Sequence, residues 1–143
     1  MKKFSFELEE ILNIRKFEQQ QAETELGKAL AEEQKIQNQL DGLAQRQAEI
    51  QHEMKGSKNF YDIANASQFY TYARNQRDKL LSELAEAKIV SDSKRETLRK
   101  AMQKTDSLEQ LKEQQREEYK EELKRREQNE VDNIVTGRFR PES

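Results

Sequence analysis

Residues 54–63 read MKGSKNFYDI, and this short stretch decides the fold. It contains glycine, serine and asparagine, the residue types that end one helix and cap the start of the next. On both sides of it, apolar residues recur at alternating steps of three and four, with no proline before Pro141. The pattern predicts two long helices, and so short a connection sets them antiparallel if they pair within one chain.

Each predicted helix carries its apolar residues on one narrow seam. In both helices ten of the fourteen seam residues are apolar, which favours a coiled-coil seam over the broader stripe of a globular-domain helix. The seam occupies positions 8, 12, 15, 19, 22, 26, 29, 33, 36, 40, 43, 47, 50 and 54, and then 63, 66, 70, 73, 77, 80, 84, 87, 91, 94, 98, 101, 105 and 108. The predicted fold class is all-α, an antiparallel coiled-coil hairpin.

The composition agrees with a fold that has only a seam for a core. Of 143 residues, 38% are charged and 33% hydrophobic, too few apolar residues for a conventional globular core. A disordered chain seldom keeps a strict apolar period, and most residues here are strong helix formers. We therefore expect an ordered, elongated pair of helices.

The whole chain, 1–143, is expected to be a single hairpin domain. The first helix is predicted at about 4–55, the turn at about 56–61 and the second helix at about 62–136, followed by a tail at 137–143. Gly137 serves as the predicted C-cap of the second helix.

The second helix is predicted to extend beyond the first. If Met54 lies opposite Ile63, Leu8 lies near Leu108, and everything after about Leu111 has no partner in the chain. This overhang nevertheless keeps large apolar residues, at Tyr119, Leu123, Val131, Ile134, Val135 and Phe139. In one interpretation, the overhangs of different chains associate with each other, or the first turn of the first helix packs against the overhang. In the other, this end of the hairpin inserts into another protein.

A second group of residues lies outside the seam of the second helix. Phe69, Tyr72, Gln76 and Lys79 follow one another at steps of three and four, so they share one face. An aromatic pair on an outer face is a natural docking anchor. The alternative is that these aromatics only thicken the hairpin near its turn.

The sequence argues against an enzyme. The one histidine, His52, lies at an outer heptad position, there is no cysteine, and four scattered glycines cannot form a phosphate-binding loop. We expect no catalytic residues, no cofactor and no metal site.

The charge and hydropathy exclude further classes. A net charge of −2 with interspersed signs argues against nucleic-acid binding. No apolar stretch is long enough to span a bilayer or resembles a signal peptide, so we expect a cytoplasmic protein without direct membrane insertion.

Two stretches resemble a known family. Residues 4–26, FSFELEEILNIRKFEQQQAETEL, are similar to the N-terminus of the flagellar type III export protein FliJ. Residues 108–130, LEQLKEQQREEYKEELKRREQNE, resemble the C-terminal helix of that family. The resemblance covers nearly the whole chain and includes the turn and the unequal helices.

The resemblance implies a stalk that works by binding. It implies as partners the hexameric flagellar export ATPase, whose assembly and activity the family promotes, the membrane-embedded export gate protein, and flagellar export chaperones. It implies a cytoplasmic protein, peripherally associated with the export apparatus at the inner membrane and monomeric alone. Carried onto this sequence, the residues expected to bind the ATPase are Leu8, Ile11, Arg15, Tyr119, Leu123, Arg126 and Ile134, and those expected to bind the gate are Phe69, Tyr72, Gln76 and Lys79.

Two alternatives of other classes remain open on the sequence. In the first, the helices pair between chains and form a structural scaffold or dimer. In the second, the hairpin is a holdase chaperone that grasps unfolded clients with its apolar ends.

Overall fold

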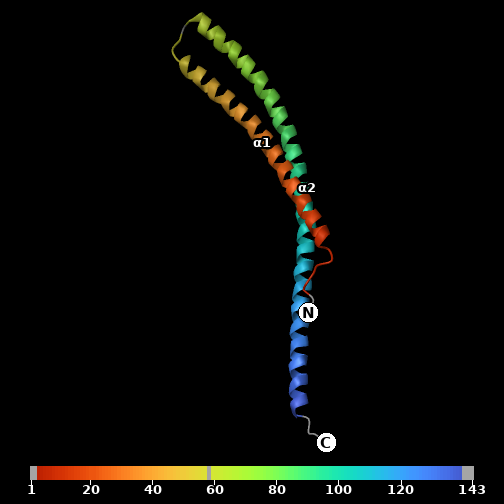
Figure 1. Cartoon of the computed structure of the whole chain (residues 1–143). Helices are drawn as coiled ribbons and strands as arrows, with labels where there is room; N and C mark the ends of the chain where they lie inside the picture. Colours follow the sequence, from red (N-terminus) through yellow and green to blue (C-terminus); the bar gives the residue numbers. More distant parts are fainter. Residues whose placement is uncertain (1–2, 58, 140–143) are drawn as a thin grey trace. The chain divides into compact units, whose positions relative to one another are not determined.

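Two long helices make up the structure, a computed structural model that describes residues 3–57 and 59–139. Helix α1 spans Glu9–Glu53 and helix α2 spans Phe60–Phe139, and a short turn joins them (Figure 1). The helices pack against each other and the described residues contain no strand, which confirms the predicted all-α hairpin. The chain divides into two compact units. The turn unit is Gln20–Arg99, and the terminal unit combines Met1–Gln19 with Lys100–Ser143.

Both helices have outer ends that differ from the predicted bounds. Helix α1 begins at Glu9 rather than near residue 4, and the N–H of Glu9 donates to the carbonyl oxygen of Phe6 at 3.1 Å. Phe6 is buried, so the chain ahead of α1 packs its side chain in a non-helical conformation. At the other end, α2 continues through Gly137 to Phe139.

The turn uses the residue types that its sequence suggested. Gly56 has a φ of 82°, a left-handed conformation that ends a helix at little cost only for glycine. The N–H of Ser57 donates back to the carbonyl oxygen of Met54 at 3.1 Å. The side-chain oxygen of Asn59 accepts from the N–H of Tyr61 at 2.9 Å, so Asn59 is the N-cap of α2.

The burial pattern follows the predicted seam closely. All fourteen predicted seam residues of α1 are buried or half-buried, and so are those of α2 with the exception of Ile63 and Arg77. Leu12 is completely buried, at 0% exposure. The other buried apolar residues are Phe6, Ala22, Ile36, Ala66, Ala73 and Leu84. The core is therefore a single line of contacts between two helices.

In the turn unit, one contact between the helices departs from the predicted register. The predicted pairing of Met54 with Ile63 would place Glu33 opposite Leu84. In the turn unit the hydroxyl of Ser91 instead donates to the carboxylate of Glu33, one heptad further along α2. The face of each helix that is buried stays the predicted one, because a shift along the seam does not rotate either helix. Ile63, the predicted partner of Met54, is 49% exposed.

The contact between Glu33 and Ser91 gives a stability prediction. Ser91 is 1% exposed, so Ser91→Ala removes a buried donor from a half-buried carboxylate and should lower the free energy of unfolding by about 1 kcal/mol. Replacing both residues, with Ser91→Ala and Glu33→Leu, should restore or exceed the wild-type stability, because neither polar group remains in the seam. Thermal unfolding followed by circular dichroism checks both variants. Equal losses in the single and the double variant would contradict the contact.

Candidate protein-binding surfaces

The terminal unit brings the chain ahead of α1 against α2. The rings of Phe4 and Tyr119 lie 5.8 Å apart between centroids, and the guanidinium carbon of Arg116 lies 5.6 Å from the centroid of Phe4. The ammonium of Lys112 lies 2.8 Å from the carboxylate of Glu9. A tilted ring pair and a cation over a ring therefore tie the N-terminal segment to α2, and an ion pair ties the first residue of α1 to it.

These contacts correct the predicted start of the overhang. Leu111 is half-buried, and Phe4 reaches as far along α2 as Tyr119, so the prediction that α2 has no partner after about Leu111 is wrong. The ion pair of Lys112 with Glu9 carries the pairing past Leu108, and the segment ahead of Glu9 is not helical. A non-helical chain spans up to about 3.3 Å per residue, against 1.5 Å in a helix, so a few residues cover more of α2.

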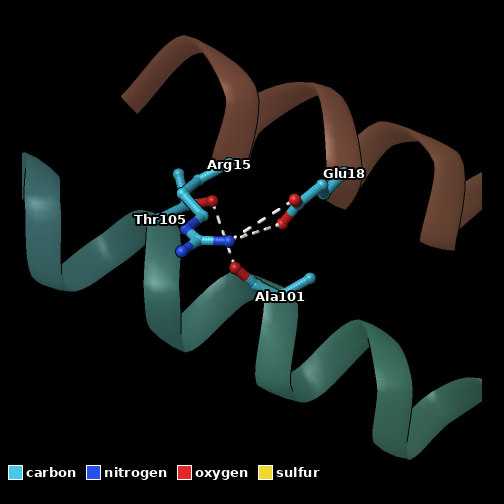
Figure 2. A network of polar contacts seen from close by, with 4 residues as sticks. All are labelled: Arg15, Glu18, Ala101 and Thr105. Atoms are coloured by element: carbon cyan, nitrogen blue, oxygen red, sulfur yellow. Dashed lines mark hydrogen bonds and ion pairs between the residues drawn. The ribbon is translucent and has the colours of Figure 1, made fainter. Parts of the chain in front are cut away.

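Arg15 lies at the seam rather than on an open surface. One of its terminal nitrogens lies 3.1 Å from a carboxylate oxygen of Glu18, on the next turn of α1. Figure 2 shows the guanidinium beside the stretch of α2 that carries Thr105, whose hydroxyl donates to the carbonyl oxygen of Ala101 at 3.1 Å. Arg15 thus already has an ion partner, and its side chain is only one third exposed, at 34%.

The outer face of α1 in the terminal unit carries a stripe that the sequence analysis missed. Ile11, which the resemblance did single out, is 43% exposed, and Ile14 and Phe17 are more exposed, at 54% and 59%. Steps of three place these residues near one another on the helix surface. The spacing of these apolar residues could have indicated a shared face. They were missed because their positions lie outside the heptad seam. Leu8, by contrast, is half-buried.

Beyond Tyr119, most of the apolar residues of α2 that the structure describes are exposed. Leu123 is half-buried, whereas Val131, Ile134 and Val135 are 53%, 58% and 46% exposed. Tyr119, Leu123 and Ile134 share one face of the helix by their spacing. Arg126 flanks this face, exposed, with its Nε 3.3 Å from the carboxylate of Glu122. We call Tyr119, Leu123, Val131 and Ile134 the distal stripe.

The turn unit holds the four residues of the second predicted surface. The ring of Phe69 lies 6.3 Å from that of Tyr72, and Phe69 is half-buried while Tyr72 is 56% exposed. Gln76 is half-buried and Lys79 is exposed. We call these four residues the aromatic stripe. Tyr72 extends into solvent, so this surface can take a partner.

The polar side chains of the described residues show further features. Across residues 3–57 and 59–139, no group of three or more His, Cys, Asp and Glu side chains could hold a metal ion. Within the same ranges, every buried side-chain polar atom has a hydrogen-bond partner. The pKa of the exposed Arg99 is raised by a hydrogen bond from its guanidinium to Glu96 and by the charge of that carboxylate. None of the described helices is long and apolar enough to cross a membrane.

The sequence matches one known protein family. A family model described as "Flagellar FliJ protein" matches residues 4–142, almost the full length. The chain belongs to the FliJ family. Searches of curated proteins and of solved structures found no match.

Membership in the FliJ family gives the chain a role related to flagellar protein export. The family is a non-enzymatic component of that export system. Both stretches that suggested the resemblance, residues 4–26 and 108–130, lie inside the matched range. Most of both stretches, residues 4–19 and 108–130, belongs to the terminal unit.

Proposed function

We propose that the chain is a stalk that binds the hexameric flagellar export ATPase and promotes its assembly and activity. The observation that carries the proposal is the distal stripe, where α2 continues past Tyr119 with Leu123 half-buried and Val131 and Ile134 exposed. An isolated, highly charged helix gains nothing from large exposed apolar residues. A ring that encloses this part of α2 would cover them.

The mechanism we propose is a shift in the assembly equilibrium. The stalk binds the assembled ring better than the free subunits, so mass action favours the ring. The contact is expected to involve the distal stripe with Arg126, together with the exposed Ile11 on α1. Leu8 and Arg15 are expected to contribute indirectly, by holding the two helices together at the seam. Both are half-buried, and Arg15 already has an ion partner.

The proposal is tested by mixing the purified chain with the flagellar export ATPase. Ring formation and ATP hydrolysis are measured in the same samples, and both are expected to rise together. The seam is filled within one chain, so we expect the free protein to be a monomer. A light-scattering mass near twice that of the chain would favour a dimeric scaffold instead.

We also propose that the aromatic stripe binds the membrane-embedded export gate protein. The chain would then be cytoplasmic and peripherally associated with the inner-membrane export apparatus, and flagellar export chaperones would be further partners. Tyr72 at 56% exposure supports a docking role, because a residue that only thickened the seam would be covered.

The gate contact gives a prediction about affinity. Phe69→Ala combined with Tyr72→Ala should weaken binding to the soluble domain of the gate at least tenfold, since two aromatic anchors at an interface typically contribute about 2 kcal/mol or more. Thermal stability should fall only slightly. Isothermal titration calorimetry measures the affinity.

A matched control uses two other aromatic residues of the turn unit. Phe60 and Tyr61 are each 77% exposed, and Phe60→Ala with Tyr61→Ala should leave gate affinity unchanged. If both double variants lose affinity equally, general apolarity of this region explains binding and the aromatic stripe has no special role. A collapse of thermal stability in the first variant would show instead that Phe69 and Tyr72 are structural.

A further inference from the structure

A cavity of about 430 Å³ opens in the turn unit between the end of α1 and the start of α2. This volume lies within the range of roughly 300 to 1,000 Å³ in which proteins bind ligands and anchor groups. The cavity, which we call the socket, is lined by Arg46, Ile50, Glu53, Met54, Asp62, Asn65, Ala66 and Phe69.

The socket follows from the register of the two helices. The seam residue that α2 supplies here is Ala66, which is buried at 7% exposure and has too small a side chain to fill the space that faces Met54. The next seam position toward the turn, Ile63, is 49% exposed. Ile50 and Met54 of α1 are only half-buried, so the apolar floor of the socket lacks a complete cover from α2.

The rim of the socket has a net negative charge. Arg46 has its ion partner outside the socket, since its terminal nitrogen lies 3.2 Å from the carboxylate of Glu49. Glu53 and Asp62 form no ion pair among the described residues, and Asp62 only accepts a hydrogen bond from the hydroxyl of Ser57 at 3.4 Å. An apolar floor beside two such carboxylates is complementary to an apolar group next to a cation.

We propose that the socket receives a leucine, methionine or phenylalanine side chain of a partner protein that carries a lysine or arginine beside it. The inference rests on the proposed gate contact and deepens it, because Phe69 belongs to both the socket and the aromatic stripe. It adds Ile50 and Met54, at the end of the first helical segment, to a contact that otherwise involves only α2. The apolar side chain anchors the partner, and the cation pairs with Glu53 or Asp62.

Methionine methyl groups provide a direct reporter for this socket. The chain has three methionines, of which Met54 lines the socket and Met102 lies on the terminal unit with 42% exposure. The full chain, labelled with ¹³C at the methionine methyl groups, is titrated with the soluble domain of the export gate. The expected result is a shift of the Met54 methyl resonance with an unchanged Met102 resonance.

Two variants separate the socket from the rest of the contact. Asn65 is exposed and lines the socket, so Asn65→Phe should close its mouth and lower gate affinity by at least about tenfold. The same change at the exposed Asn129 of the terminal unit is the matched control and should leave affinity unchanged. Glu53→Lys should also lower gate affinity, because the new lysine repels the cation of the partner. This loss of affinity should be smaller at high salt, which screens the repulsion.

The outcomes distinguish failure of the socket from failure of the gate contact. Gate binding with an unmoved Met54 resonance and an unaffected Asn65→Phe variant would overturn the socket and leave the gate contact standing. A wild-type chain that does not bind the gate domain would overturn both. Asn65→Phe and Asn129→Phe losing affinity equally would also overturn the socket.

Discussion

Tyr119→Ala combined with Leu123→Ala is expected to abolish the stimulation of the export ATPase while most of the helicity remains. Both residues belong to the distal stripe and both are half-buried in the free chain. Anchors of this kind contribute about 2 kcal/mol or more each at a protein interface, so losing two should lower ring affinity by at least a hundredfold. ATP hydrolysis, measured against the concentration of added chain, reports the loss.

The structure adds a control that this experiment needs. The ring of Tyr119 packs against that of Phe4, so its removal also costs the terminal unit part of its own packing. Tyr119→Phe keeps the ring and should retain most of the stimulation. Tyr61→Ala with Leu81→Ala removes the same residue types from exposed positions of the turn unit and should leave stimulation unchanged. Full stimulation by the Tyr119 and Leu123 double variant would remove the distal stripe from the mechanism.

Leu12→Ala is expected to give the largest loss of stability of any single leucine replacement in the terminal unit. Leu12 is 0% exposed, and truncating a fully buried leucine typically costs about 2 to 5 kcal/mol through lost transfer energy and the cavity left behind. For a chain of this size the midpoint of thermal unfolding should fall by roughly 10 °C. A narrow seam has few other contacts that could compensate.

The matched comparison for Leu12 is an exposed leucine. Leu81 is 48% exposed, so Leu81→Ala should change the free energy of unfolding by no more than about 1 kcal/mol. Circular dichroism during heating measures both variants. Similar midpoints for the two would contradict the placement of Leu12 in the core.

The fold could be predicted from the sequence because a coiled coil requires a regular repeat of apolar residues. A three-four period of apolar residues fixes which face of each helix is buried, and the structure buries that face almost throughout. Gly56 could be assigned because a left-handed helix end favours few residue types. The N-cap could only be narrowed to a few polar residues, of which the structure uses Asn59.

The register could not be predicted, because a heptad pattern looks the same after a shift of seven residues. Contacts such as that between Glu33 and Ser91 select one register, and the sequence offers many polar seam residues that could do so. The placement of Phe4 against Tyr119 depends on that register and on a non-helical segment, which periodicity does not describe. The socket depends on it too, since its lining comes from both helices.

The predicted binding residues separate into two groups in the structure. Tyr72, Lys79, Ile11, Arg126 and Ile134 are exposed and can contact a partner directly. The other six are half-buried, namely Leu8, Arg15, Phe69, Gln76, Tyr119 and Leu123. For Leu8 and Arg15 the reason is that their heptad positions also face the other helix. Sequence spacing gives the face of a residue, whereas exposure depends on where the opposite helix ends.

The central claim is that the chain activates the export ATPase by favouring its assembled ring. The most direct measurement is the fold stimulation of ATP hydrolysis by a saturating amount of the chain, over a series of ATPase concentrations, with ring formation followed by electron microscopy. We expect strong stimulation at concentrations where the ATPase alone is unassembled. The stimulation should fall toward zero at concentrations where rings already form without the chain. The same fold stimulation at every ATPase concentration, with no change in the number of rings, would contradict it.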